Sequence, residues 1–290
     1  MAHHPDARQR RARRLLTALL VLLSPSAVAA QAILVAPQGV VLNNRDRTGT
    51  VELYNPSERA AEVSIRAVYG HPTTTADGDL TLELVEQPPT SEPSAAGFIE
   101  AFPRRLVLQP NQRQTVRLLA RPPAGLADGE YWARMIISSK DAERPASAVV
   151  DTATVSVGLT LEVRTIIAVN YRNGVQRTGV TLGELTATAT PDSLVLRAPM
   201  QRTGTAAWIG LTTVKLLNPS GGVVATHTLQ TAVYQSIVPR FAFDRRALPP
   251  GRYRISVDVN TDRPDVTQAT LLRAPPQHAE TSITIPSAGS

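Results

Sequence analysis

The feature that most constrains this chain is a long run of alternating apolar and polar residues close to its middle. The apolar residues of one parity are Val155, Val157, Leu159, Leu161, Val163, Ile167, Val169 and Tyr171. A period of two places such residues on one face of an extended strand. We therefore predict a long strand with one apolar face, ending at the turn signal Arg172-Asn173-Gly174.

Shorter alternating runs recur along the chain, and turn signals rich in Pro, Gly, Asn and Asp separate them. They predict strands at 51–54, 63–69, 80–85, 106–108, 115–119, 131–138, 185–189, 193–198, 209–217, 223–226 and 253–259. The segment Asp77-Gly78-Asp79 lacks the remaining ligands of a calcium loop, so we predict a hairpin turn there.

A chain of 290 residues is long enough for about two domains. The strand pattern predicts an all-β protein with two immunoglobulin-like β-sandwich domains, at 32–174 and 175–290. No disulfide can form, because the chain has no cysteine. Each domain must therefore depend on its hydrophobic core.

The first 31 residues have the features of a secretory signal peptide. A basic block spans 8–14, an apolar run follows at 15–23, and small residues fill 27–32. The apolar run is shorter than the roughly 20 residues that span a bilayer. We predict cleavage between Ala29 and Ile33, export to the periplasm and no stable membrane insertion afterwards. An uncleaved anchor is the alternative.

The net charge of +6 does not predict a nucleic-acid partner. Five arginines of the targeting segment account for most of it, and the remaining chain is close to neutral. No motif of a nucleotide, zinc or nucleophile-elbow site occurs. We therefore predict a protein that is not an enzyme and that holds no cofactor or metal. A catalytic triad assembled in space stays open as an alternative.

Three segments of the first domain together resemble a known family. The run Pro103–Leu118 contains a proline, an apolar strand, the turn Gln109-Pro110-Asn111-Gln112 and a Val-Arg strand. Asn111 stands where glycine is usual, and asparagine tolerates the same left-handed conformation. With the segment 126–132 and the alternating strand 158–171, this run resembles the PapD-like periplasmic chaperones of pilus assembly.

The resemblance covers about 140 residues of the first domain and implies a function. In that family the seventh strand adds to an incomplete pilus subunit and fills its groove with alternating apolar side chains. It implies that the partner-binding residues here are Leu159, Leu161, Val163, Ile167 and Val169. The implied partners are pilus or other exported subunits, with an outer-membrane usher as a further candidate. That these side chains fill their own core is the alternative.

Other positions depart from the family or match it in part. The family holds the terminal carboxylate of its subunit with two basic residues, whose positions Gly39 and Ala168 occupy here. Arg164, Arg172 and Arg45 are candidates to replace them. The resemblance also implies a structural ion pair between Arg117 and Glu130 that helps fix the angle between domains. An exposed pair of little energetic consequence is the alternative.

A second function fits the same predicted fold. A structural or adhesive cell-surface protein could be built from the same immunoglobulin-like domains, since a fold alone does not fix a function. The two hypotheses differ over the strand 159–169. A donor strand needs an exposed edge, whereas a structural module would have this edge covered or paired.

Overall fold

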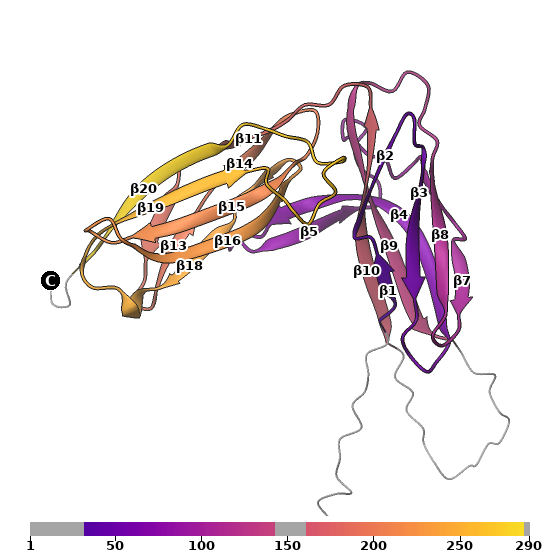
Figure 1. The fold of residues 1–290 in the computed structure, drawn as a ribbon, viewed down its shortest axis with the longest axis horizontal. Coiled ribbons are helices and arrows are strands. Elements are labelled where there is room, and N and C mark those ends of the chain that lie inside the picture. The colour runs from indigo at the N-terminus through magenta and orange to yellow at the C-terminus, as the bar shows by residue number, and fades with distance from the viewer. Residues whose placement is uncertain (1–31, 143–160, 287–290) are drawn as a thin grey trace, which may run out of the picture.

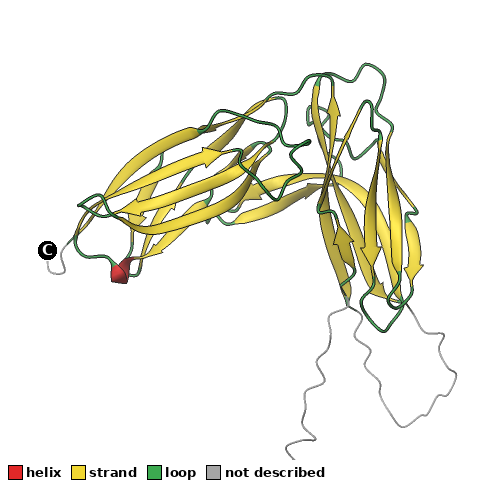
Figure 2. Cartoon of the chain, viewed as in Figure 1, coloured by secondary structure: helices red, strands yellow, loops and turns green. Residues whose placement is uncertain are grey.

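The computed structural model describes residues 32–142 and 161–286. Within these ranges the chain is all β apart from one short 3-10 turn, η1 (Arg245–Ala247), as Figure 2 shows. No helix of the described part is long and apolar enough to cross a bilayer. The predicted signal peptide and Leu159 lie outside the described residues.

The first half of the chain forms ten strands in two facing sheets. The strands are β1 (Leu34–Ala36), β2 (Gly39–Asn43), β3 (Thr48–Tyr54), β4 (Ala61–Thr74), β5 (Leu80–Val85), β6 (Ile99–Phe102), β7 (Arg105–Leu108), β8 (Arg113–Ala120), β9 (Gly129–Asp141) and β10 (Glu162–Asn173). One sheet has the order β1-β3-β8-β6 and the other β2-β10-β9-β4-β5, with β7 beside β4. Alternating apolar residues of both sheets fill the space between them and form one buried core.

The second half forms another sandwich with its own core around Trp208. Its strands are β11 (Thr178–Leu182), β12 (Thr186–Ala189), β13 (Ser193–Arg197), β14 (Met200–Gly204), β15 (Trp208–Leu217), β16 (Val223–Val233), β17 (Ser236–Ile237), β18 (Arg240–Asp244), β19 (Gly251–Asn260) and β20 (Gln277–Ile285). They form three sheets, in the orders β11-β14-β17, β12-β13-β18 and β16-β15-β19-β20. The predicted all-β fold with two sandwiches is confirmed.

The two sandwiches lie at an angle to each other, so that the molecule has the outline of a bent arm (Figure 1). β10 ends at Asn173 and β11 begins at Thr178, so only four residues join the sandwiches directly. A second connection is the β4–β5 hairpin, which leaves the first sandwich and extends along the second (Figure 1). A small buried cluster of Tyr69, Trp132, Ala207 and Tyr234 fills the junction between the two cores.

Two local predictions from the sequence are confirmed by the backbone. Asn111 has a φ of +56°, the left-handed conformation expected of the residue that replaces glycine in this turn. The segment Asp77-Gly78-Asp79 lies in the turn between β4 and β5, and Gly78 has a φ of +85°. The prediction of a strand at 80–85 coincides with β5.

Candidate protein-binding edge

Within the described ranges, the first half of β10 has a neighbouring strand on one side only. β9 pairs with β10 along its whole length, from Glu162 to Asn173. On the other side β2 pairs in parallel from Ala168 to Arg172. Among the described residues, nothing pairs with the second edge of β10 between Glu162 and Ile167.

The direction of the main-chain groups along this edge follows from one hydrogen bond. The Ala168 N–H donates to the carbonyl oxygen of Gln38, on the β2 side of the strand. N–H and C=O groups of a strand point to alternate sides from one residue to the next. The main-chain groups of Glu162, Arg164 and Ile166 therefore face the unpaired edge, where an added strand would bond.

Charged side chains stand beside these free groups. Arg164 donates a hydrogen bond from Nε to Glu162 Oε1 over 2.9 Å, and both side chains are exposed. This bond holds the pKa of Glu162 below its usual range. Charges on an edge strand oppose unselective pairing with other chains, so this edge is exposed but protected.

The predicted apolar row divides into an accessible part and a buried part. Leu161, just before β10, is 56% exposed, and Val163 is half-buried. Ile167 and Val169 are 1% and 0% exposed and belong to the core of the first sandwich. The prediction is therefore corrected for these two residues, because their side chains already pack inside their own domain.

A groove of about 530 Å³ lies beside the start of β10. Its lining combines Glu162 with residues of β4, β7 and β9, including Leu106 and the exposed Val107. The groove extends from Glu162 across β9 to β4 and β7, so it lies on the β9 side of β10 and not on its open edge.

The two positions that lack the family's basic residues are direct neighbours in space. Ala168 of β10 pairs with Gly39 of β2 on one side and with Arg134 of β9 on the other. Residues opposite each other in neighbouring strands share a face of the sheet. A cation thus stands in this cross-strand row, one strand away from the expected positions.

Arg134 is a buried cation that has no carboxylate partner among the described residues. It is 4% exposed, and its guanidinium carbon lies 4.6 Å from the ring centre of Tyr234, which belongs to the second sandwich. Its Nε has no hydrogen-bond partner in the described part of the chain. A cation–π contact of this kind compensates part of the desolvation of a charge but leaves its hydrogen bonds unmade.

The three arginines proposed from the sequence as replacements are placed differently. Arg164 pairs with Glu162, and Arg172 pairs with Glu130. Arg45 lies in the turn beyond the end of β2. The pattern of the sequence alone could not distinguish Arg134, since its burial depends on Tyr234, 100 positions further along the chain.

The predicted ion pair between Arg117 and Glu130 is wrong. Arg117 is exposed on β8, while Glu130 is buried on β9 of the facing sheet. Val116 and Leu118 on β8, and Tyr131 and Ala133 on β9, point toward the core. Arg117 and Glu130 therefore point away from the core on opposite sides of the sandwich, and no ion pair joins them.

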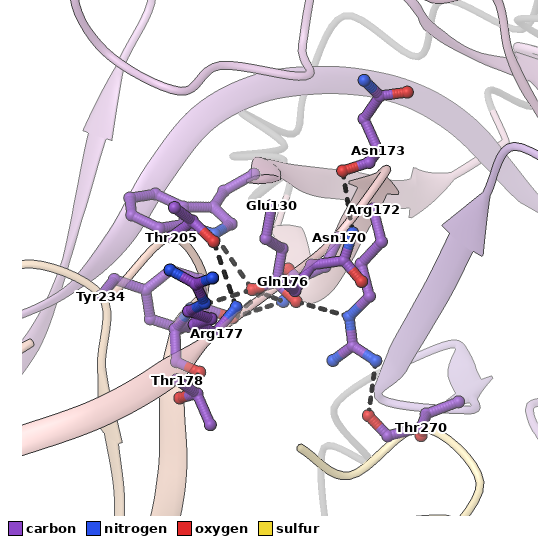
Figure 3. A network of polar contacts seen from close by, with 12 residues as sticks. Glu130, Asn170, Arg172, Asn173, Gln176, Arg177, Thr178, Thr205, Tyr234 and Thr270 are labelled. Atoms are coloured by element: carbon purple, nitrogen blue, oxygen red, sulfur yellow. Dashed lines mark hydrogen bonds and ion pairs between the residues drawn. The ribbon is translucent and has the colours of Figure 1, made fainter. Parts of the chain in front are cut away.

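Glu130 instead forms a buried node between the two sandwiches (Figure 3). Its Oε2 accepts a hydrogen bond from Arg172 Nε over 2.8 Å. Its Oε1 accepts from Trp132 Nε1, from Asn170 Nδ2 and from the Ala207 N–H of the second sandwich, each at 3.1 Å. The interdomain role implied for Glu130 fits this geometry, with Arg172 as its partner.

The node reaches the second sandwich through main-chain groups as well. The Glu130 N–H donates to the Thr205 carbonyl oxygen over 2.9 Å, and Arg172 Nη1 donates to the Thr270 carbonyl oxygen over 2.7 Å (Figure 3). Every charge of the pair is thus satisfied by hydrogen bonds, which is the condition for a buried ion pair to persist.

Comparisons with known proteins returned matches among solved structures. No protein-family model and no curated protein matches the sequence. One similar structure is the CsuC–CsuE chaperone and tip-subunit pre-assembly complex of Acinetobacter baumannii Csu pili (13% identity, TM-score 0.44), where 86% of this chain and 97% of that chain are covered. Another is the Salmonella enterica SafA pilin in complex with the SafB chaperone (15% identity, TM-score 0.41, 87% and 98% covered).

We expect Arg172→Met to lower the free energy of unfolding by about 3–5 kcal/mol, because it leaves the buried Glu130 carboxylate without its charge partner. Arg117→Met is the matched control, and an exposed substitution of this kind should change stability by no more than about 0.5 kcal/mol. Urea unfolding followed by tryptophan fluorescence measures both. Equal effects of the two substitutions would contradict the pairing described here.

Proposed function

We propose that this protein is a periplasmic chaperone-like protein that binds pilus or other exported subunits by β-strand addition. The observation that carries the proposal is the unpaired edge of β10 between Glu162 and Ile167, next to the exposed side chain of Leu161. An extended segment of a partner could continue the sheet at this edge. An outer-membrane usher is part of the proposal as a further partner.

The chemistry of such an edge is well suited to a partner that lacks a strand. The free N–H and C=O groups of the β10 edge would pair with those of the partner's strand. Each hydrogen bond would contribute about 0.5–1.5 kcal/mol net. Leu161 and Val163 would add apolar area to the partner's core, at roughly 25 cal/mol per Å² removed from water. Main-chain pairing gives affinity without sequence selectivity, and the side chains supply the selectivity.

The proposal includes an anchor for a carboxylate at Arg134. A guanidinium binds a carboxylate through charge-assisted hydrogen bonds. Arg134 occupies the same cross-strand row as Gly39 and Ala168. Gly39 and Ala168 carry no charge, so neither would compete with Arg134 for a carboxylate. The partner's terminal carboxylate is the group we propose for this position.

The alternative is a structural or adhesive surface protein. A permanent structural module would have the β10 edge covered or paired. Here the described residues leave it unpaired, and the charged side chains of Arg164 and Glu162 lie beside it. The described residues contain no cluster of three or more potential metal ligands. Our proposal remains a binding protein, exported by the signal peptide predicted at 1–31.

The side-chain contribution is tested by Leu161→Glu. We expect the variant to fold normally, because Leu161 is 56% exposed, and to lose its partner, because a charge would enter the partner's core. Val223→Glu is the control, since Val223 is 55% exposed but lies on β16 of the second sandwich. Co-expression with a pilus subunit of the same genome, followed by co-purification, gives the readout. Equal recovery of the subunit by both variants would place binding elsewhere.

The main-chain contribution is tested by two prolines at adjacent positions. Arg164→Pro removes an N–H that faces the open edge, so the fold should survive while strand addition is blocked. Thr165→Pro removes an N–H on the β9 side and should destabilise the domain by about 3 kcal/mol or more. Circular dichroism and the same co-purification separate the two. Full binding by folded Arg164→Pro would exclude pairing at this edge.

The anchor is tested with a peptide of the subunit's carboxyl terminus, prepared as the free acid and as the amide. Wild-type protein should prefer the acid by about 10-fold or more, the effect of one charge-assisted hydrogen bond of about 1.5–3 kcal/mol. Arg134→Met should abolish the preference. Arg202→Met is the control, because Arg202 lies over Trp132 but already donates to the carbonyl oxygens of Tyr234 and Gly204. A preference that persists in Arg134→Met would refute the anchor.

A further inference from the structure

The β4–β5 hairpin belongs to two parts of the molecule. Residues 61–68 of β4 pair with β9 in the first sandwich. Residues 69–74 pair only with β5, and this part of the hairpin extends along the second sandwich (Figure 1). A fourteen-residue strand is longer than the first sandwich needs, so its second half requires another explanation.

The tip of the hairpin is a turn closed by its own hydrogen bonds. The Thr75 N–H donates to the Asp79 carbonyl oxygen, and the Gly78 N–H donates to the Thr75 carbonyl oxygen, each over 2.9 Å. The Thr75 hydroxyl accepts from the Asp79 N–H over 3.2 Å. The turn thus holds its shape without help from the second sandwich.

This tip binds the start of β18 in the second sandwich. The Arg240 N–H donates to the Gly78 carbonyl oxygen over 3.0 Å, which is a main-chain bond of the kind that joins strands. Arg240 Nε also pairs with Asp79 Oδ1 over 2.8 Å. A Cβ on Gly78 would lie 3.0 Å from the Val238 carbonyl oxygen and from the Arg240 Cβ.

Two further contacts widen the attachment. Arg197 Nη1 donates to the Ala76 carbonyl oxygen over 3.0 Å, and the Val238 N–H donates to the Thr74 hydroxyl over 2.9 Å. The attachment therefore involves both β13 and the segment that leads into β18.

The base of the hairpin is attached separately. The Tyr69 hydroxyl donates to Glu92 over 2.6 Å, and Gln235 Nε2 of the second sandwich donates to the same carboxylate over 2.7 Å. Burial, together with Glu92, raises the pKa of Tyr69, so its hydroxyl stays protonated as a donor. Base and tip are five strand residues apart, which is about 17 Å at 3.3–3.4 Å per residue.

We propose that the β4–β5 hairpin is a brace that fixes the angle between the two sandwiches. The Glu130 node and the base of the hairpin lie at the junction, where they hold the sandwiches together but act as a pivot. The tip binds far from that pivot, so it opposes rotation with a long lever arm. The brace does not depend on what binds the β10 edge.

The test measures a distance between the sandwiches. Because the chain has no cysteine, Thr50→Cys on β3 and Thr188→Cys on β12 can carry two spin labels at exposed positions. Double electron–electron resonance should give a narrow distance distribution for the parent protein. Gly78→Ala should shift and broaden it, because the added Cβ pushes the tip away from Val238 and Arg240.

Gly221→Ala is the matched control. Gly221 also has a φ of +85°, but nothing lies within 4 Å of its hypothetical Cβ. Both substitutions therefore place a side chain at the same positive φ, and only the one at Gly78 disturbs an interdomain contact. The control should keep the parent distribution.

A second variant protects the test against misfolding. If circular dichroism shows that Gly78→Ala does not fold, the same distance is measured in the double variant Arg197→Ala and Arg240→Ala. This variant removes the side-chain contacts of the tip with the second sandwich and leaves the turn itself unchanged. A broadened distribution in the folded variant supports the brace. A distribution that matches the parent protein and the Gly221→Ala control overturns it.

Discussion

The arrangement of the two sandwiches depends on one buried carboxylate. Glu130 accepts hydrogen bonds from Arg172, Asn170 and Trp132 of the first sandwich and from the Ala207 N–H of the second. A lone carboxylate at this depth would be costly, so the node is stable only when both sandwiches supply their donors. Two of these residues, Trp132 and Ala207, also belong to the small aromatic cluster at the junction. Charge satisfaction thus specifies where the two sandwiches meet, which apolar packing alone would leave less defined.

β10 is held differently along its two halves, and the node accounts for part of this difference. Its second half carries Asn170 and Arg172 toward the junction and Ile167, Val169 and Tyr171 toward the core, and β2 closes its edge there. The second half of β10 is therefore paired on both edges, with β2 and with β9. Its first half has only β9 as a neighbour in the described ranges, so it keeps a free edge on a rigid base. A strand with one fixed end presents its open edge in a defined direction.

Much of the fold could be predicted from the sequence, because alternating apolar residues mark half-buried strands. Some of the strands that escaped prediction lack this pattern. β14 is largely polar, with Met200 alone reaching the core, and β17 has two residues. β18 does alternate, with Phe241 and Phe243 buried, so its sequence pattern is typical of a strand. The ion pair could not be predicted, because it depends on the register that places Arg172 of β10 opposite Glu130 of β9, while Arg117 lies on the other sheet.

The proposed carboxylate contact and the interdomain angle are physically linked. Arg134 lies on the first sandwich, and the ring that covers it, Tyr234, lies on the second. The hydroxyl of Tyr234 contacts Asn170, which also binds Glu130. Any rotation of one sandwich against the other would move Tyr234 away from Arg134 and let water reach the guanidinium. A cation surrounded by water binds a carboxylate weakly, whereas one shielded by an aromatic ring binds it more strongly. The proposed carboxylate contact therefore depends on the same contacts that hold the two sandwiches in place.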